Sequence, residues 1–231
     1  MNSGVKIYFG DAHDNMTKEY QKNIQSMDTL LYQKNIKSLY AVQQIHGISH
    51  VVLDEVADGS HVLAEEADIL ITNKKNIGIA VFTADCVPLL LYAPDKEVIT
   101  AVHAGWKGSV KGVAARAVDL LIENFEIDSN KLQIFIGPSI HLPCFEVGKE
   151  VIEKVQETSY ERMTLYVGKE DGKTYCDLVE LNIQFLLSRG CLFRNINRRE
   201  SFCTLCIPTY HSSRRNGKQS MGRQISFIAL R

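Results

Sequence analysis

The chain has 231 residues, of which 45% are hydrophobic, and this is enough apolar material for a buried core. No linker-like stretch divides it, so we expect a single domain over residues 1–231. The formal net charge of −1 gives no general attraction to nucleic acid or anionic lipid, and we expect neither as a partner. The sequence contains no apolar run of about 18 residues that could span a membrane and no secretory signal pattern, which favours a cytoplasmic protein.

The first half of the chain predicts mostly strands. Short strands are expected at 5–9, 38–45, 50–53, 69–72 and 77–82. Between the first two, apolar residues at helical spacing predict an amphipathic helix over 17–36, with Thr17 as its cap. His46 and Gly47 form a turn or bulge between two of the strands.

A hairpin is predicted in the middle of the chain. Apolar runs at 89–92 and 98–102 flank a turn sequence that contains Pro94 and Asp95. Antiparallel pairing around this turn matches residues whose numbers sum to about 190. Cys86 then lies opposite Ala104, give or take one residue, and close to His103.

The second half alternates helices and strands. A helix is expected after Gly108 with Ser109 as its cap, and its N-terminus would favour an anionic group near His103. Further helices are expected at 147–156 and at 177–187, the latter capped by Asp177, with strands at 132–136, near Phe193 and Ile196, and at 225–230. This mixture predicts an α/β (α+β) sandwich with mixed sheets.

Three side chains could form a metal site. His46, Cys86 and His103 each lie at the end of a predicted strand, and two imidazoles with one thiolate leave one position of a zinc tetrahedron open, as in catalytic sites. Asp85 is either a hydrogen-bond partner of a ligand histidine or an ordinary strand-end residue. A single histidine at a strand end is more often structural, so spacing alone is a weak signal.

Other chemistries use some of the same residues. Cys86 could act as a nucleophile with His103 as its base. The Cys203-x-x-Cys206 pair with His211 has metal-ligand spacing, but lacks a second pair, and plain packing of the two cysteines is the preferred interpretation. The six cysteines as a whole are expected to be reduced.

Eight motifs together resemble a known family. They are QIHG at 44–47, ADILIT at 67–72, TADCVPLL at 83–90, AVHAGWKG at 101–108, IGPSI at 136–140, CFEVG at 144–148, CT at 203–204 and SSRR at 212–215. Their order and spacing are similar to those of the laccase-domain, YfiH-like family of purine nucleoside phosphorylases, also known as polyphenol oxidases or peptidoglycan editing factors. The resemblance extends from about residue 40 to the C-terminus.

The resemblance implies a fold, a metal and an activity. The fold would be an α/β sandwich shared with certain cysteine hydrolases. A zinc ion, or alternatively a copper ion, would be held by His46, Cys86 and His103, which would also be the catalytic residues. The implied reactions are phosphorolysis of adenosine, inosine and methylthioadenosine, and deamination of adenosine by attack of a zinc-activated water on C6. The partners would be purine nucleosides and phosphate, and the protein a monomer or weak homodimer.

We assign anion binding to a second set of residues. Arginine side chains suit phosphate oxygens, and Arg214, Arg215 and Arg223 are therefore expected to bind phosphate or substrate, together with Ser139. An isolated arginine pair is also common on a solvated loop.

The chain departs from the family pattern in several places. Its N-terminal segment lacks the usual S-L-N-type motif, His141-Leu142-Pro143 replaces a small-residue turn, and Asn216 stands where Asp often follows the arginines. Three alternatives to the phosphorylase remain: a cysteine-type amide hydrolase editing peptidoglycan precursors, a copper-dependent polyphenol oxidase, and a non-catalytic protein with a structural zinc.

Overall fold

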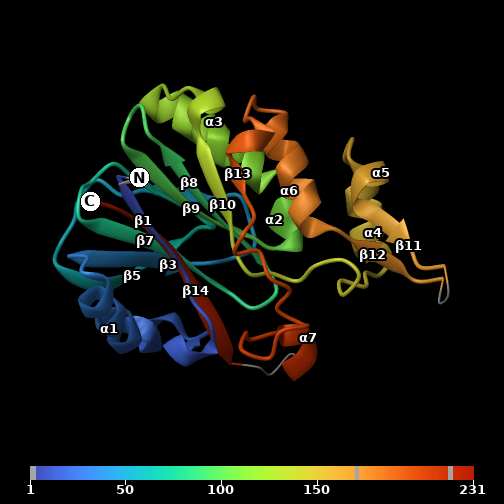
Figure 1. Cartoon of the computed structure of the whole chain (residues 1–231), viewed down its shortest axis with the longest axis horizontal. Coiled ribbons are helices and arrows are strands. Elements are labelled where there is room, and N and C mark those ends of the chain that lie inside the picture. The colour runs from blue at the N-terminus through green and yellow to red at the C-terminus, as the bar shows by residue number, and fades with distance from the viewer. Residues whose placement is uncertain (1–3, 170–171, 218–220) are drawn as a thin grey trace.

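The computed structural model describes residues 4–169, 172–217 and 221–231, and in it two mixed β-sheets face each other between helices (Figure 1). The first sheet has the order β1-β14-β7-β3-β5, with β2 paired to β14. Its strands are β1 (Val5–Phe9), β2 (Met16–Thr17), β3 (Ser38–Gln43), β5 (Gly59–Glu66), β7 (Ile77–Thr83) and β14 (Gly222–Leu230). The strands β3, β5 and β7 run parallel, and the other pairs of this sheet are antiparallel.

The second sheet has the order β13-β10-β8-β9-β6-β4. Its strands are β4 (His50–Val52), β6 (Ile69–Thr72), β8 (Val87–Ala93), β9 (Val98–Ala104), β10 (Gln133–Ile136) and β13 (Ile196–Asn197). The edge pairs β4–β6 and β10–β13 are parallel, and the centre of the sheet is antiparallel. Both sheets are therefore mixed.

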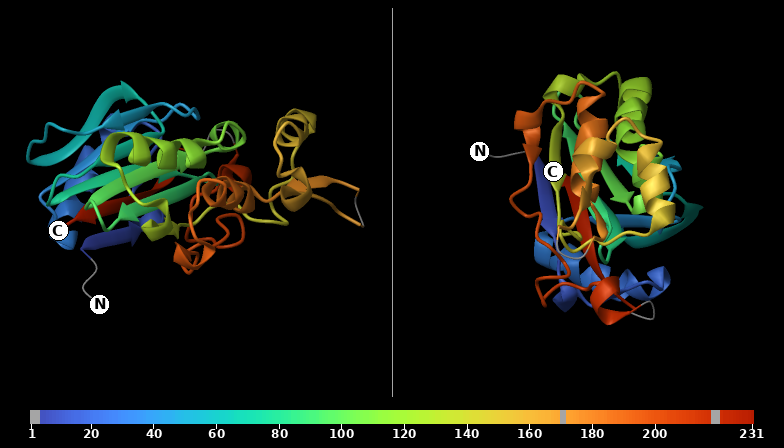
Figure 2. Two further views of the ribbon diagram at one scale, coloured as in Figure 1. Left: turned by 90° about the horizontal axis from the view of Figure 1, so that it is seen from above. Right: turned by 90° about the vertical axis from the view of Figure 1, so that its right-hand side faces the viewer.

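Helices cover the outer faces of the two sheets. Helix α1 (Ile24–Lys34) packs on the first sheet, whereas α2 (Trp106–Val110), α3 (Val113–Phe125) and α6 (Leu178–Leu187) cover the second (Figure 1). The remaining elements are α4 (Lys149–Gln156), α5 (Glu161–Thr164), α7 (Ser213–Asn216), the ribbon β11 (Leu165–Val167) with β12 (Thr174–Cys176), and the 3-10 turns Ala12–Asp14, Tyr20–Asn23, Ser129–Lys131 and Phe193–Asn195. Figure 2 shows that α4, α5 and the ribbon project from one end.

The core consists of apolar layers on both sides of each sheet. Along β7, Ile79 and Val81 point between the sheets, whereas Ala80 and Phe82 face α1. Along β9, Ile99 points between the sheets and Val102 faces the helices. Strands that are buried on both faces are almost wholly apolar and do not alternate between apolar and polar residues. The strands β7 and β9 follow this pattern. The mixed single-domain sandwich that the sequence predicts is confirmed.

Most predicted elements are present, and the central hairpin has the expected register. Val87 pairs with Ala104 and Pro88 with His103, so paired numbers sum to 191, one more than expected. The helix capped by Asp177 is confirmed: the Asp177 side chain accepts a hydrogen bond from the N–H of Glu180. In the described residues, no helix is both long and apolar enough to cross a bilayer.

Several sequence expectations are wrong. Thr17 ends strand β2 and does not cap a helix; α1 begins only at Ile24 after a 3-10 turn. Ser109 is not a cap either, since it lies buried inside α2, where its hydroxyl accepts a hydrogen bond from Asn182. The residues around Phe193 form a 3-10 turn, and strand β5 was not predicted. Polar exposed residues on β5 hid its strand pattern.

Candidate metal centre and cavity

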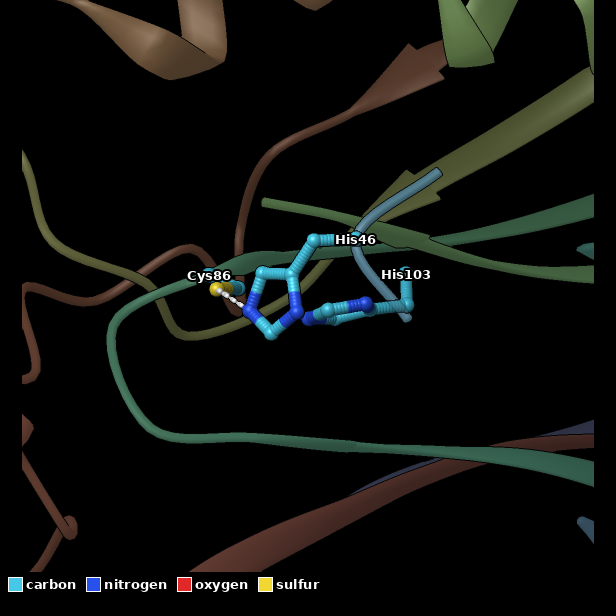
Figure 3. A group of neighbouring side chains, drawn as sticks. All are labelled: His46, Cys86 and His103. Atoms are coloured by element: carbon cyan, nitrogen blue, oxygen red, sulfur yellow. Dashed lines mark hydrogen bonds between the residues drawn. The ribbon is translucent and has the colours of Figure 1, made fainter. Parts of the chain in front are cut away.

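His46, Cys86 and His103 meet where the chain crosses from one sheet to the other. His46 lies in the connection from β3 to β4, and Cys86 lies in the connection from β7 to β8; both connections pass from the first sheet to the second. His103 lies on β9, next to the partner of Val87 in the hairpin. Figure 3 shows the two imidazole rings and the thiol turned toward one another.

The three side chains have the spacing of metal ligands. Their ligand atoms all lie within 4.8 Å of one another, and Nε2 of His46 is 3.8 Å from Sγ of Cys86. The rings of His46 and His103 are nearly perpendicular, with centroids 4.7 Å apart. Two imidazole nitrogens and one sulfur are a donor set that suits zinc, and three protein ligands leave one tetrahedral position open. The donor chemistry therefore fits a metal ion.

Asp68 orients both histidines. Its carboxylate is fully buried and accepts hydrogen bonds from Nδ1 of His103 at 2.7 Å and from the backbone N–H groups of His46 and Gly47, at 3.0 and 2.6 Å. The bond to Nδ1 leaves Nε2 of His103 as the nitrogen available to a metal. Asp68 belongs to the motif at 67–72, to which the sequence alone gave no chemical role. An acidic residue directly before the apolar run 69–72 was the available signal.

Asp85, the expected partner of a ligand histidine, bonds elsewhere. Its carboxylate accepts hydrogen bonds from the Thr204 hydroxyl at 2.8 Å and from the Arg214 backbone N–H at 3.0 Å. Asp85 adopts a left-handed conformation, with φ of 89°. It thus ties the Cys86 loop to the C-terminal loops, and Asp68 is the carboxylate on His103.

Close backbone packing holds the three ligands together. A Cβ atom on Gly105 would lie 2.6 Å from Cδ2 of His46 and 3.2 Å from Sγ of Cys86, so only glycine fits there without a shift. The Gln44 side chain forms two hydrogen bonds with the backbone of Phe82, at 2.7 and 2.8 Å. These bonds lock the His46 loop onto strand β7, which leads to Cys86.

The electrostatics favour a charged Cys86–His103 pair. Burial would raise the pKa of the Cys86 thiol, but the charge of His103 and hydrogen bonds with both histidines outweigh it and lower the pKa to about 6. Burial would likewise lower the pKa of His103, whereas the Cys86 thiolate and the Asp68 hydrogen bond raise it to about 9. The hydrogen bond and charge of His103, with the backbone N–H groups of Gly47 and His46, hold the pKa of Asp68 below its ordinary value despite its burial. A pKa of about 6 favours the thiolate form of Cys86 at neutral pH.

The three residues line a cavity of about 610 Å³. Aromatic and aliphatic side chains form much of its wall, and two arginines reach it. The lining residues are Tyr20, Gln44, His46, Phe82, Ala84, Asp85, Cys86, His103, Trp106, Ile140, Phe145, Val147, Gly148, Val151, Leu178, Ser213, Arg214, Gly217 and Arg223. Ligand sites are typically of this size and combine an apolar wall with a few polar groups.

The arginines fall into two groups. Arg214 and Arg223 line the cavity, and the Arg214 guanidinium lies 5.2 Å from the centre of the Phe145 ring and donates to the Glu146 carbonyl. Arg215 is different, because its guanidinium donates to the carbonyls of Thr204, Leu205, Ile207 and Tyr210. Arg215 is therefore a loop-holding residue, which corrects its expected role in anion binding.

Ser139 also lies apart from the cavity. Its side chain is fully buried, and its backbone pairs with the loop at residues 202–204 through the Phe202 carbonyl and the Thr204 N–H. Its neighbour Ile140 lines the cavity instead. Ser139 is thus not among the residues that line the cavity, where its expected substrate contact would require it.

The expected helix N-terminus is displaced. No helix of the described chain begins directly after Gly108; α2 begins after Gly105, and α3 begins after Gly112, which is left-handed. Helix α4 also begins at the cavity, since its N-cap Gly148 is among the lining residues and has no side-chain cap bond.

A second thiol group involves residues that the sequence did not join. Cys144, Cys203 and Cys206 place their sulfurs within 4.8 Å of one another. His211, which the sequence paired with Cys203 and Cys206, instead donates its backbone N–H to Gln224. The third residue of this group is therefore Cys144, 59 positions before Cys203 in the chain.

Comparisons with known proteins agree with this architecture. A family model described as multi-copper polyphenol oxidoreductase laccase matches residues 2–231. A purine nucleoside phosphorylase of Clostridium acetobutylicum is 32% identical over 96% of this chain and 90% of its own length, and an adenosine deaminase from an unknown prokaryotic organism is 32% identical over 84% and 76%. The crystal structure of the hypothetical protein YfiH of Bacillus licheniformis has a TM-score of 0.83 at 25% identity, covering 98% of this chain and 93% of that one.

Proposed function

The chain belongs to the family described as multi-copper polyphenol oxidoreductase laccase, and from relatives named purine nucleoside phosphorylase we propose that it is a zinc-dependent enzyme with that activity. Its substrates would be adenosine, inosine and methylthioadenosine, with deamination of adenosine as a second activity. Relatives bearing the names purine nucleoside phosphorylase and adenosine deaminase support the substrate class.

One observation carries the proposal: two imidazoles and one thiol with the spacing of metal ligands lie in the wall of a cavity large enough for a nucleoside. A structural zinc is usually closed by four protein ligands, whereas a catalytic one keeps a position for water or substrate. When bound by His46, Cys86 and His103, zinc supplies a Lewis acid and lowers the pKa of bound water.

The cavity wall offers binding groups for both parts of a nucleoside reaction. Trp106 and Phe145 present aromatic surface that suits a purine base. Arg214 and Arg223 supply positive charge that suits phosphate, and they would hold it against the ribose as the base departs. Asp68 keeps His103 in the tautomer that leaves Nε2 for the metal.

The test is a product analysis with a matched cysteine control. Zinc-loaded protein is incubated with adenosine with and without phosphate, and adenine, ribose 1-phosphate and inosine are separated by chromatography. We expect adenine and ribose 1-phosphate only with phosphate, and inosine in both cases. Cys86→Ala should lose all three products and one equivalent of zinc, whereas Cys191→Ala, altered at a buried thiol away from the cavity, should keep them. An active, zinc-free Cys86→Ala variant would overturn the mechanism.

A second candidate is a cysteine-type amide hydrolase acting on peptidoglycan precursors. It is favoured by the lowered pKa of Cys86 and the raised pKa of His103, which together make a thiolate–imidazolium pair. Amide hydrolysis that persists in metal-stripped protein and disappears on alkylation of Cys86 would favour this candidate. Activity that requires zinc would exclude it.

Copper-dependent phenol oxidation ranks below both. The described residues contain one group of metal-ligating side chains with histidines, and it has a single thiolate and two imidazoles. Within the part of the chain that the structure describes, the additional copper ligands of a laccase have no counterpart beside it. Copper remains an alternative occupant of this one site, to be separated from zinc by metal analysis.

A further inference from the structure

Cys144, Cys203 and Cys206 form a compact thiol cluster on two loops. Cys144 lies in the connection from β10 to α4, and the other two lie in the connection from β13 to α7. All three sulfurs lie within 4.8 Å of one another, and those of Cys144 and Cys206 are 3.3 Å apart. The described residues that line the cavity include none of these three cysteines. The cluster is thus separate from the His46 site.

The loop that carries Cys203 and Cys206 closes in a turn. The Ile207 N–H donates to the Cys203 carbonyl at 3.1 Å. The Cys203 sulfur lies near the backbone N–H groups of Leu205 and Cys206 and, from the other loop, of His141. This turn folds the Cys-x-x-Cys pair around one point.

The two loops are joined before any ligand binds. The Ser139 N–H donates to the Phe202 carbonyl at 3.0 Å, and the Thr204 N–H donates to the Ser139 carbonyl at 2.9 Å. These bonds keep Cys144 and the Cys203 turn in register. A preformed set of three soft ligands lowers the ordering cost of binding.

We propose that Cys144, Cys203 and Cys206 bind a second zinc ion, separate from the one at His46, Cys86 and His103. Thiolates are preferred zinc ligands, and Cys-x-x-Cys is a spacing of zinc sites. Cys206 is exposed and Cys144 and Cys203 are partly exposed, so the ion can enter from solvent and water can complete the tetrahedron. Binding displaces the three thiol protons to solvent and requires no oxidant.

The second ion would hold one wall of the cavity. Phe145 follows Cys144 directly and lines the cavity, with the Arg214 guanidinium over its ring. Arg215 donates to the carbonyls of Thr204 and Leu205, inside the Cys203 turn. A zinc ion bridging the two loops therefore fixes Phe145 relative to Arg214 and acts as a positioning site.

The first experiment counts metal. Reduced, metal-stripped protein is titrated anaerobically with Zn²⁺ against a chromophoric chelator. We expect two equivalents for the unaltered chain and one for Cys206→Ser, which changes an exposed side chain and so spares the fold. Cys86→Ser should also bind one, the double variant none, and Cys191→Ala, altered at a buried thiol outside both groups, two.

The second experiment counts sulfur ligands with Co²⁺ as the probe. The intensity of the cobalt–thiolate charge-transfer band rises with the number of thiolates bound. The two sites together hold four, so Cys86→Ser should keep about three quarters of the band and Cys206→Ser about one quarter. Circular dichroism of each variant checks that the fold is intact.

Two results would overturn the proposal. One is a single equivalent of zinc in the unaltered chain that Cys86→Ser removes. The other is a Cys144–Cys206 disulfide in protein purified under reducing conditions, detected as four free thiols instead of six and as a cross-linked peptide by mass spectrometry. Neither result affects the proposed phosphorylase, which requires only the ion at Cys86.

Discussion

At the scale of single residues, the site is a row of three interacting charged side chains. Asp68 is bonded to Nδ1 of His103, and the other face of His103 meets Cys86 beside His46. Each member changes the proton affinity of the next, because a thiolate, an imidazolium and a carboxylate are close together in a mostly buried setting. Two predictions test the two ends of this row, Cys86 and Asp68.

Alkylation of Cys86 should report its lowered pKa. In metal-stripped protein the iodoacetamide rate at Cys86 should stay constant above about pH 7 and fall as the pH drops through about 6, since only the thiolate reacts. His103→Ala removes the largest stabilising charge and should move this midpoint upward. The rate is followed by mass spectrometry of the Cys86 peptide, with buried Cys191, whose pKa is raised to about 12, as the slow control. An unchanged midpoint in His103→Ala would contradict the charge pair.

Asp68→Asn should weaken the metal site from the other end. The amide keeps the size of the side chain but loses the charge on His103, and altered partners of ligand histidines typically cost about 10–100-fold in metal affinity. Zinc affinity is measured by chelator competition. Asp85→Asn is the matched control, since Asp85 bonds Thr204 and Arg214 and should leave that affinity within a few-fold. The assignment fails if the two variants lose affinity equally.

At the scale of elements, the site depends on connections that cross between sheets. The β8–β9 hairpin brings His103 beside the Cys86 loop, and the β3–β4 connection adds His46. Two features beside the site can be changed singly: the close approach at Gly105 and the arginine pair on α7.

Gly105→Ala should displace His46 although none of the three ligand residues is itself substituted. The added methyl would lie 2.6 Å from the His46 ring, closer than Cβ contacts occur, and its backbone conformation is otherwise ordinary for alanine. Zinc affinity should fall at least tenfold by chelator competition. Gly148→Ala, where the methyl meets open space, should bind zinc normally and so controls for loss of a glycine.

The two arginines on α7 should separate binding from stability. Arg214→Ala should raise the KM for phosphate about 10–100-fold, because hydrogen bonds to charged groups contribute about 1.5–3 kcal/mol. It should lower the unfolding temperature less than Arg215→Ala does, because only the Glu146 carbonyl loses its donor. Arg215→Ala should lower the unfolding temperature by a few degrees, because four carbonyls lose their donor. Steady-state kinetics and thermal melts are compared for both variants. A larger phosphate effect from Arg215→Ala would reverse the assignment.

At the scale of the whole molecule, the proposed metal would link binding to folding. His46 and Cys86 lie in two connections between the sheets and His103 lies on β9, so only the folded chain brings the three together to hold an ion. Any ligand of this kind raises the free energy of unfolding by mass action.

Zinc removal should therefore lower thermal stability in a pH-dependent way. Free zinc at a hundred times its Kd adds about 2.7 kcal/mol, roughly 5–10 °C for a chain of this size. The shift should shrink below about pH 6, where the Cys86 thiol takes up a proton and competes with the metal. Calorimetry with and without chelator at pH 7.5 and pH 5 measures it. Cys86→Ser retaining the whole shift at pH 7.5 would exclude this site as its origin.

Local sequence was sufficient for much of the fold and for one contact of the site. The apolar runs of β6, β7, β8 and β9 and the Asp177 cap are properties of neighbouring residues, and each is confirmed. The pairing of Cys86 with His103 also follows locally, because a hairpin is set by its turn. No local pairing places His46 beside Cys86 and His103; its strand-end position was a weak signal, and the motifs shared with a family were the stronger one.

Only the tertiary structure decided the contacts between segments that are distant in the chain. Asp68 rather than Asp85 bonds His103, Arg215 is held by loop carbonyls while Arg214 reaches the cavity, and Cys144 joins Cys203 and Cys206. The physical reason is common to all three. Residue type and spacing determine what a side chain can do, whereas its partner depends on how two sheets and their connecting loops pack in space.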